Sequence, residues 1–439
     1  MSPLPSVEAA DGVADGVDDV ADDVDVVCLG ESMVTFVPSR PGRLADVPSF
    51  ARGIGGAESN VACGLARAGH RARWISRVGT DGFGEHLVRE IAATGVDTAY
   101  VQRDPHRPTG IYFRTAGERA VGPEAVDRPE AVDGSGPADG NGAAESSEPP
   151  EPPEPLAEVV YYRAGSAAAA MSPALIPRER AWSGRVLHLT GITPALSADC
   201  RTLMRELTAR APGRPLVSFD LNYRVSLWQK GEEEAGADGE SGSAVLLDLA
   251  RRCDLVFVGE DEAEAVWGLR GPAAIRAALP EPEVLVVKQG GAGATAYARR
   301  SGDGAGARRS GDGADAGRPG HNAGARRPGD RTDAVTFEPA PRVDVVAPVG
   351  AGDAFAAGFL SGTLRGLPVA ERLRHGHLMA AAALTVPGDL GTPPSRERAD
   401  QLVALDATRW GTLRFGPGWT DLPAPAEKWA ETAAVEVSD

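Results

Sequence analysis

The stretch that decides the fold reads Pro348-Val349-Gly350-Ala351-Gly352-Asp353-Ala354-Phe355-Ala356-Ala357-Gly358-Phe359. A β-like run, residues 342–346, precedes it, and an apolar, Ala-rich segment with helical character, residues 351 to about 365, follows it. A strand, a Gly-rich turn and a helix start make an anion site, because free backbone N–H groups point outward and the helix dipole adds roughly half a positive charge. Gly350 and Gly352 let the backbone of this turn come close to a ligand without Cβ clashes.

Asp353 is the unusual member of this turn. A carboxylate one turn into an anion-binding helix does not serve to bind phosphate, but it can take a proton from a hydroxyl that attacks the phosphate. The alternative is structural. A Gly-Ala-Gly-Asp turn can simply start a helix, with the Asp353 carboxylate near the N-terminus because of the helix dipole.

The length and composition indicate a globular protein. The chain has 439 residues with 42% hydrophobic residues, enough for one large or two medium domains with a sizeable core. No apolar run approaches 18 residues, and the acidic N-terminus lacks the apolar region of a secretory signal. Cys28, Cys63, Cys200 and Cys253 are scattered without metal-binding spacing, which is typical of reduced thiols in a cytoplasmic protein.

The net charge of −17 is concentrated in low-complexity segments. Residues 1–25 hold eight acids and no bases, and residues 116–157 hold ten acids and two arginines. A third segment, residues 299–334, is Arg- and Gly-rich with an internal repeat. The rest of the chain is therefore nearly neutral and shows no basic stripe, so we expect no nucleic-acid partner and no membrane partner.

These segments set the expected domain organisation. They have too few apolar residues to offset the entropy of ordering, so we expect a disordered acidic tail at 1–24 and disordered insertions at 116–157 and 299–334. One folded domain then covers residues 25–410, and residues 411–439 form a C-terminal tail. The alternative is that the charged segments are interaction arms.

The remaining sequence alternates strands and helices. The expected strands are residues 24–29, 72–78, 185–189, 216–219, 255–258 and 284–287. The expected helices are residues 58–68, 84–94, 198–211, 243–252, 263–268, 273–278 and 369–386. This order predicts an α/β fold, a mostly parallel sheet with helices on both faces, whose ligands sit at the carboxyl ends of the strands.

The two internal insertions separate pairs of strands. Residues 109–113 and 159–163 flank the first insertion, and residues 294–297 and 335–337 flank the second. Each pair is typical of a hairpin with a greatly extended turn. The insertions should therefore leave the core intact.

A second Gly-rich turn lies near the N-terminus, in residues 53–66. Gly55 and Gly56 permit close approach of a small polar ligand, and Asn60 on the following helix can donate and accept hydrogen bonds. The alternative is a tight turn followed by a helix face of small residues.

Arginines and amides follow two other strands. Arg163 closes the aromatic run Tyr161-Tyr162 and could bind a carboxylate in a bidentate way, or could simply be a solvated strand-end residue. Asp220, Asn222 and Arg224 alternate, so in an extended segment they share one face, suited to phosphate and sugar-acid contact or to a structural ion pair.

A third Gly-rich loop follows the strand predicted at residues 284–287. Lys288, Gly290 and Gly293 belong to it, and alone it is a weak signal of nucleotide binding.

The run at 348–359 resembles the C-terminal signature of the ribokinase-like (PfkB) family of sugar kinases, and the Gly-Gly-Ala-Glu-Ser-Asn run at 55–60 resembles its N-terminal signature. Asp-x-Asn-x-Arg at 220–224, Tyr-Tyr-Arg at 161–163 and Thr-Gly-Ile-Tyr-Phe at 109–113 resemble the 2-keto-3-deoxygluconate kinases within that family. The resemblance covers about residues 24–115, 158–298 and 335–402. It implies a three-layer α/β/α sandwich with a small β-strand lid, which also forms the family's usual dimer contact.

The resemblance also implies roles for the residues that match its motifs. It makes Asp353 the catalytic base, with the N–H groups of Gly350, Ala351 and Gly352 stabilising the transferring phosphoryl group of ATP. Glu262 matches the acid linked to Mg²⁺. The implied substrate contacts are Gly55, Gly56, Asn60, Tyr112, Tyr161, Arg163, Arg224 and Asp389, and the implied nucleotide contacts are Asn222, Lys288, Gly290, Gly293, Gly350 and Gly352.

Two positions depart from the family pattern. Ala347 stands where the family usually has an Asp associated with a monovalent-cation site, and Gly259 replaces the Asn of the Asn-x-x-Glu motif that ends at Glu262. The expected function is phosphorylation of 2-keto-3-deoxygluconate by ATP, by a homodimer or higher oligomer formed through the lid. The alternatives are a fructokinase or ribokinase-type enzyme, or a sugar-binding homologue without catalysis.

Overall fold

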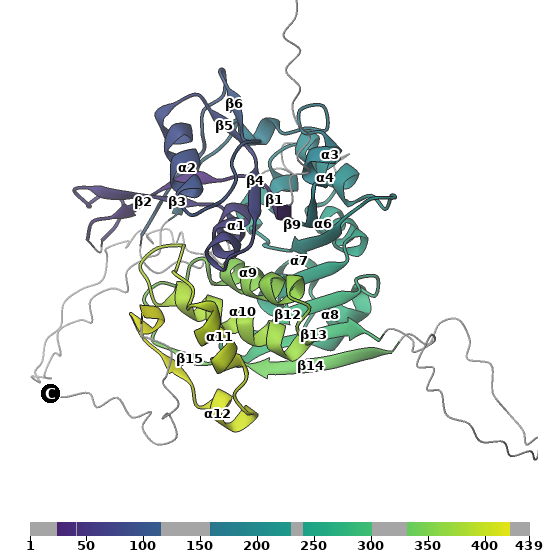
Figure 1. Ribbon diagram of the computed structural model, residues 1–439. Helices are drawn as coiled ribbons and strands as arrows, with labels where there is room; N and C mark the ends of the chain where they lie inside the picture. The colour runs from purple at the N-terminus through teal and green to yellow at the C-terminus, as the bar shows by residue number, and fades with distance from the viewer. Residues whose placement is uncertain (1–23, 41, 116–158, 230–239, 301–331, 422–439) are drawn as a thin grey trace, which may run out of the picture.

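The structure is a computed structural model that describes residues 24–40, 42–115, 159–229, 240–300 and 332–421 (Figure 1). The strands are β1 (Val24–Leu29), β2 (Met33–Pro38), β3 (Phe50–Gly55), β4 (Ala72–Ile75), β5 (Arg77–Gly79), β6 (Gln102–Asp104), β7 (Ile111–Arg114), β8 (Val159–Tyr162), β9 (Gly184–Thr190), β10 (Leu216–Asp220), β11 (Leu255–Gly259), β12 (Val284–Lys288), β13 (Gly293–Arg299), β14 (Asp333–Pro339), β15 (Arg342–Val343) and β16 (Arg414–Phe415). The helices are α1 (Ala57–Arg67), α2 (Gly82–Ala92), α3 (Arg178–Ala181), α4 (Ala198–Thr208), α6 (Gly242–Arg252), α7 (Glu260–Trp267), α8 (Pro272–Ala278), α9 (Ala351–Leu364), α10 (Val369–Leu384), α11 (Arg396–Val403) and α12 (Ala407–Gly411).

An eight-stranded sheet forms the centre, in the order β14-β13-β12-β11-β10-β9-β1-β4. Six neighbouring strands of this sheet run parallel, namely β4, β1, β9, β10, β11 and β12. Strands β13 and β14 are added antiparallel at one edge. The predicted mostly parallel sheet is therefore confirmed. Each of the six parallel strands was predicted from a short apolar run, which is typical of strands buried on both faces.

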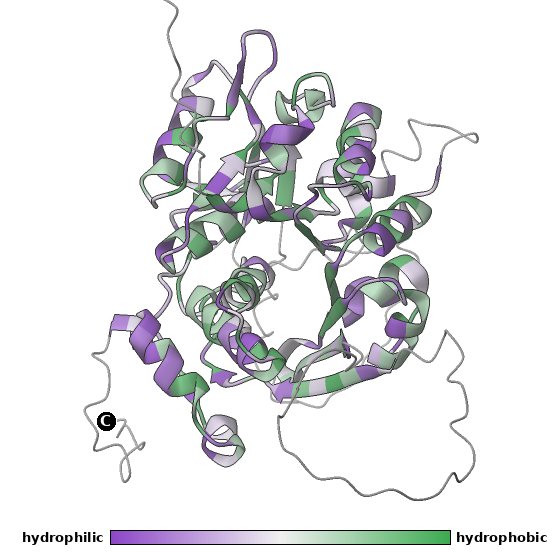
Figure 2. Cartoon of the chain, turned by 45° about the vertical axis from the view of Figure 1, so that its right-hand side comes forward, coloured by the Kyte–Doolittle hydropathy of each residue, from purple (hydrophilic) through white to green (hydrophobic). Residues whose placement is uncertain are grey.

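Helices cover both faces of this sheet. Successive side chains of a strand point to opposite faces, so in β1 Val27 packs with the cluster that includes α4 and α6, while Val26 packs with the cluster that includes α1 and α9. Figure 2 shows apolar residues on the central strands and polar residues on the outward faces of the helices. The molecule is thus the three-layer α/β/α sandwich that the sequence predicted, and the predicted helices match within three residues at each end.

A smaller sheet, β3-β2-β7-β8, forms the lid beside the sandwich. The predicted hairpin of β7 and β8 is confirmed, with Tyr112 opposite Tyr161. Sequence reasoning missed β2, which pairs with β7 in parallel, and β3, which pairs with β2 antiparallel. The hairpin of β13 and β14 is also confirmed, with Arg299 opposite Asp333.

Several predicted boundaries were wrong. The expected strand at 72–78 is two strands, because β4 ends at Ile75 and β5 pairs instead with β6. The acidic tail predicted at 1–24 ends one residue too late, because Val24 is the first residue of β1. The insertion predicted at 299–334 overlaps both strands that flank it, because Arg299 lies in β13 and Asp333 lies in β14. Residues 1–23 and 116–158 lie outside the described residues, as do 301–331.

The segment 342–346 and the predicted C-terminal tail are connected. Only Arg342–Val343 is a strand, and it pairs in parallel with β16 outside the main sheet. Residues 411–421 pack on the domain, because Trp410, Phe415 and Trp419 are buried in a cluster with α10 and α11. The ordered domain therefore continues beyond residue 410, and residues 422–439 lie outside the described residues.

The four cysteines are buried and form no disulfide. Within the described residues, no helix is long and apolar enough to cross a membrane.

Candidate active site

The glycine turn before α9 has the conformation of an anion site. Gly350 caps the helix with φ +74°, a left-handed conformation that favours glycine, and a Cβ there would lie 2.2 Å from the backbone oxygen of Asp389. Among the described residues no side chain caps this end of α9. The N–H groups of Ala351 and Gly352 therefore point out of the helix end, where the dipole favours negative charge.

Asp353 lies one turn inside α9 and is held by two amides. The Asn60 amide nitrogen donates to one carboxylate oxygen at 2.9 Å, and the Asn222 amide nitrogen donates to the other at 3.4 Å. Burial raises the pKa of the Asp353 carboxyl to about 7, with Asp220 adding to the rise and the Asn60 hydrogen bond opposing it. A carboxyl that titrates near neutral pH is suited to accept a proton.

Lys288 lies beside the same turn, at the end of β12. Its ammonium donates to both oxygens of Asp220, at 2.9 and 2.8 Å, and is 3.5 Å from the Cβ position of Gly352. Burial lowers the pKa of Lys288, but the Asp220 and Glu262 carboxylates outweigh this and raise the pKa above its usual value. A fixed positive charge therefore stands next to the helix end.

The predicted shared face of Asp220, Asn222 and Arg224 was wrong in its geometry. The strand ends at Asp220, and Asn222 adopts φ 40°, so the segment is not extended there. Asn222 turns inward and is buried, while the Arg224 side chain is exposed. The three residues still converge on one site, because Lys288 pairs with Asp220, and Asp220 and Arg224 both act on the pKa of Asp353.

Glu262 lies in the first turn of α7 and accepts from the N–H of Gly259 at 2.8 Å. Burial raises its pKa, and Lys288 opposes the rise. Among the described residues no three His, Cys, Asp or Glu side chains are grouped as a metal cage. Asp220 already pairs with Lys288 through both oxygens, which leaves the Glu262 carboxylate as the group of the kind that Mg²⁺ takes together with waters and phosphate oxygens.

The loop after β12 carries the other predicted nucleotide contacts. Gly290 has φ +57° and Gly293 has φ +141°, and a Cβ at Gly293 would lie 2.4 Å from the backbone oxygen of Glu338. Both positions therefore favour glycine, which keeps this loop narrow next to β14.

The second glycine turn leads from β3 into α1. A Cβ on Gly56 would lie 2.5 Å from the backbone oxygen of Glu31, so this turn packs directly on the loop after β1. The Asn60 amide, predicted as a substrate contact, is directed at Asp353. The turn thus lies next to the base.

The lid contributes Tyr112, whose predicted position at the site is supported by its contacts. Its ring lies 5.3 Å from that of Tyr161, and its hydroxyl donates to Asp389 at 3.0 Å. Asp389 also accepts from Arg114 at 2.6 Å, and Arg114 and Asp389 are both buried. Sequence reasoning missed Arg114, although its place two residues after Tyr112 in a strand puts the two side chains on one face.

Arg163 is not the free strand-end arginine that was one reading of the sequence. Its guanidinium pairs with the buried carboxylate of Glu31, which also accepts from the Ser166 hydroxyl at 3.0 Å. The guanidinium also lies over the Tyr161 ring, 5.5 Å from its centre. Glu31 was missed, because the pairing of residues 132 apart is visible only in the fold.

A second buried carboxyl lies behind the base. Glu58, in the first turn of α1, accepts from the hydroxyls of Thr190 at 2.8 Å and Thr193 at 2.9 Å. Burial raises its pKa to about 7, and repulsion from Asp353 contributes.

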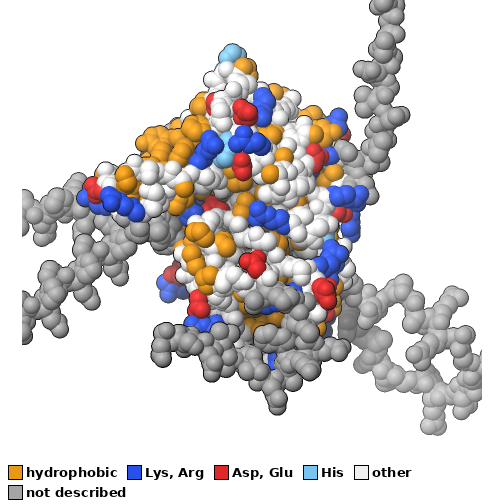
Figure 3. Space-filling model, turned by 60° about the vertical axis from the view of Figure 1, so that its left-hand side comes forward, with side chains coloured by type: hydrophobic (Ala, Val, Ile, Leu, Met, Phe, Trp, Pro, Cys, Tyr) orange, Lys and Arg blue, Asp and Glu red, His pale blue; other side chains and the backbone are white. Residues whose placement is uncertain are grey.

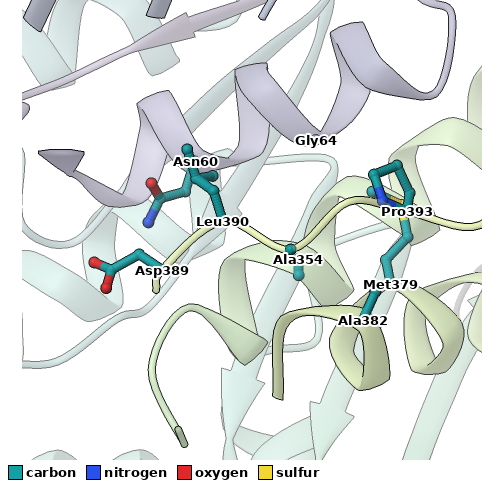
Figure 4. A pocket seen from close by; sticks show the side chains of 9 residues that line it. Asn60, Gly64, Ala354, Met379, Ala382, Asp389, Leu390 and Pro393 are labelled. Carbon is teal, nitrogen blue, oxygen red and sulfur yellow. The ribbon is translucent and has the colours of Figure 1, made fainter. Parts of the chain in front are cut away.

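A small cavity opens beside Asn60 (Figure 4). Asn60 on α1 and Asp389 on the loop after α10 lie at one end, and Met379 and Ala382 lie at the other. The polar end of this cavity is therefore formed by two of the predicted substrate contacts.

Comparisons with known proteins identify the family of this chain. A model of the pfkB family carbohydrate kinases matches residues 23–126, 157–310 and 324–396. A 2-dehydro-3-deoxygluconokinase of Bacillus subtilis is 30% identical over 88% of this chain and 97% of its own length. A 2-dehydro-3-deoxygalactonokinase of Haloferax volcanii is 28% identical over 85% of this chain and 96% of its own length. A probable fructokinase of Arabidopsis thaliana is 25% identical over 86% of this chain and 82% of its own length.

Solved structures show the same fold. A PfkB protein of Polaromonas sp. JS666 superimposes with a TM-score of 0.60 and 29% identity, covering 87% of this chain and all of that one. A sugar kinase of Pyrococcus horikoshii, solved in complex with ATP, superimposes with a TM-score of 0.59 and 23% identity, covering 88% of this chain and 99% of that one.

Proposed function

This chain belongs to the pfkB family of carbohydrate kinases, and on that premise we propose that it transfers the γ-phosphoryl group of ATP to a hydroxyl of 2-keto-3-deoxygluconate, giving the 6-phosphate. The observation that carries the catalytic part is the Asp353 carboxylate, held by Asn60 and Asn222 at the open end of α9. The similarity to 2-dehydro-3-deoxygluconokinase (the same sugar acid under its other name) supports the substrate.

The chemistry follows from the groups around α9. Asp353, with a pKa near 7, takes the proton of the attacking hydroxyl. The N–H groups of the turn at Gly350–Gly352 and the ammonium of Lys288 face the negative charge on the transferring phosphoryl group. Mg²⁺ would be held by ATP oxygens and by Glu262, directly or through water, and would neutralise phosphate charge.

The lid closes the sugar side of this arrangement. Tyr112 and Tyr161 stand together at the lid edge of the site, with Gly55 and Gly56 at the turn below them. Arg163 and Arg224 are the proposed carboxylate contacts, with the exposed Arg224 offering the less encumbered guanidinium. Closure of the lid would exclude water from the phosphoryl group and limit wasteful ATP hydrolysis.

The first experiment is an ADP-release assay with ATP and Mg²⁺, comparing 2-keto-3-deoxygluconate, fructose and ribose. We expect preference for the sugar acid, and a loss of roughly three orders of magnitude in kcat for Asp353→Asn, since general-base catalysis contributes about 10²–10⁴-fold. Full activity of Asp353→Asn would remove the base from the mechanism.

A neutral-sugar kinase is the second candidate. Arg163 and Arg114 are each already paired with a carboxylate, which leaves the sugar side close to neutral, and fructokinases are among the relatives. Turnover of fructose or ribose in preference to the sugar acid, with Arg163→Ala leaving that turnover nearly intact, would favour this candidate.

We also propose that two copies associate through their lids. Strand β8 exposes Val160, Tyr161 and Tyr162, the last with 62% of its surface accessible. Figure 3 turns the lid side of the molecule forward and shows apolar side chains gathered on its upper part. Light scattering should give twice the chain mass, and Tyr162→Lys should reduce the measured mass to that of one chain.

The free, buried cysteines support a cytoplasmic location.

A further inference from the structure

Arg114, Asp389 and Tyr112 form a buried cluster between the lid and the sandwich. Arg114 ends lid strand β7, and Asp389 lies in the loop after α10, 275 residues away in the sequence. Both oxygens of Asp389 are occupied, one by the Arg114 guanidinium at 2.6 Å and the other by the Tyr112 hydroxyl at 3.0 Å. The Arg114 and Asp389 side chains are each only 4% exposed, so water does not screen this ion pair.

The backbone of Asp389 continues this connection to the phosphoryl-transfer turn. A Cβ on residue 350 would lie 2.2 Å from the carbonyl oxygen of Asp389, so the backbones of Gly350 and Asp389 are in direct contact. A displacement of residue 389 toward Gly350 would therefore disturb the turn whose N–H groups would face the phosphate.

The same cluster also touches the sugar-side turn. A Cβ on Gly55 would lie 2.3 Å from the Tyr112 hydroxyl and 2.8 Å from a carboxylate oxygen of Asp389. Because Gly55 has no side chain, the Tyr112 hydroxyl has the space to reach the Asp389 carboxylate. The cluster stands between the sugar-side turn and the phosphate-side turn and contacts both.

We propose that Arg114 is a positioning residue, which holds Asp389 through their ion pair and so ties the lid strand to the Gly350 turn. The inference rests on the proposed function and deepens it. When the lid is seated over a sugar, the pair fixes the backbone of residue 389 and with it the donors that face the transferring phosphoryl group. Without the pair the lid and the turn move independently, and the enzyme loses its preference for a sugar hydroxyl over water.

The pair is also poorly replaceable. Removing one partner leaves the other charge buried and uncompensated, and a buried unpaired charge reorganises its surroundings. An arginine fixes the carboxylate by a planar, directed contact, which a lysine reproduces only in charge. Arg114→Lys should therefore restore part of what Arg114→Gln loses.

The test measures two rates on the full chain, ADP release with the sugar substrate and ADP release with ATP alone. Their ratio does not depend on the fraction of folded enzyme, so a merely structural defect leaves it unchanged. We expect the ratio to fall at least 10-fold in Arg114→Gln and in Asp389→Asn, and the double variant to be no worse than the lower single one, because both remove the same interaction. Arg52→Gln, an exposed arginine on lid strand β3, is the matched control and should keep the wild-type ratio.

Three outcomes overturn the inference. If both rates fall by the same factor in Arg114→Gln, or if the two substitutions add in the double variant, the pair has no positioning role. A wild-type chain that phosphorylates no sugar would overturn the proposed function and the inference with it, whereas an active wild type with an unchanged ratio in the variants overturns the inference alone.

Discussion

At Asp353, two amides from distant parts of the chain fix one carboxylate. Asn60 comes from the first helix and Asn222 from the segment after β10, and each donates to a different oxygen. The sequence predicted both asparagines at the site, as contacts to sugar and nucleotide. In the structure they also orient the base, a role that depends on distances and not on residue type.

Asn60→Ala should move the pH profile of the kinase. The Asn60 hydrogen bond favours the charged carboxylate and so lowers the pKa of Asp353, which burial raises to about 7. Without it the pKa rises, and because the base works only when deprotonated, the midpoint of the kcat profile should shift up by roughly one pH unit. The profile is measured between pH 5.5 and 9.

Asn222→Gly is the matched control for this shift. Glycine keeps the φ of 40° that Asn222 adopts, and the hydrogen bond that it removes is longer, at 3.4 Å. Its profile should shift less than that of Asn60→Ala. Equal profiles for all three proteins would mean that neither amide tunes the base.

Among the elements, the predictable ones carry their signal locally. The six parallel strands are short apolar runs, and helices such as α2 and α4 are amphipathic with a capping residue in front, Asp81 and Ser197. The lid strands β2 and β3 and the pair of β15 with β16 were missed. Their pairing depends on partners that no local pattern reveals, and β16 lies about 70 residues after β15.

The close packing of the turn before α9 predicts that adding a single methyl group to Gly350 impairs catalysis. Gly350→Ala places a Cβ at φ +74° and 2.2 Å from the backbone oxygen of Asp389, so the turn must shift. We expect kcat to fall at least roughly 100-fold, since one displaced oxyanion donor costs about 10²–10³-fold. Steady-state kinetics measure the fall in kcat, and a thermal melt measures how much the shifted turn destabilises the fold.

Gly366→Ala separates strain from displacement. Gly366 follows α9, has φ +70°, and has open space around its Cβ position. This variant should lose only about 1 kcal/mol of stability and keep its activity. If it lost activity as Gly350→Ala does, the geometry of the turn would not be the cause.

Over the whole molecule, the sequence predicted well which residues lie at the site. It predicted less well which partner each of these residues contacts. Asp353, Asn60, Lys288, Tyr112 and Asp389 come together as expected. The pairing of Arg114 with Asp389 and of Arg163 with Glu31 was not foreseen. Such pairs join segments more than a hundred residues apart, and no spacing rule links them.

Glu58 gives the whole fold a pH-dependent stability. Its folded pKa of about 7 is above the ordinary 4.5, so the folded state binds the proton more tightly, and the associated stability is present below pH 4.5 and lost as the pH rises through 7. At pH 8 the ionised carboxyl costs on the order of 3 kcal/mol. Glu58→Gln keeps an acceptor for Thr190 and Thr193 and should be more stable than the wild type at pH 8.

Urea unfolding at pH 5 and pH 8 checks this expectation. The difference between Glu58→Gln and the wild type should be larger at pH 8 than at pH 5. Glu283→Gln, an exposed acid that caps no helix, is the control and should show no such dependence. A pH-independent difference would show that Glu58 is not the titrating group.

The parallel pairing of β15 with β16 has a consequence for synthesis on the ribosome. The segment that leads into the catalytic turn gains its neighbour only when Arg414 and Phe415 emerge. Most of the sandwich, from β1 to α10, can assemble earlier, as each strand follows its predecessor out of the exit tunnel. A nascent chain can therefore form most of the sandwich before β15, the strand that precedes the catalytic turn, gains its neighbour, and the residues around β16 complete the domain last.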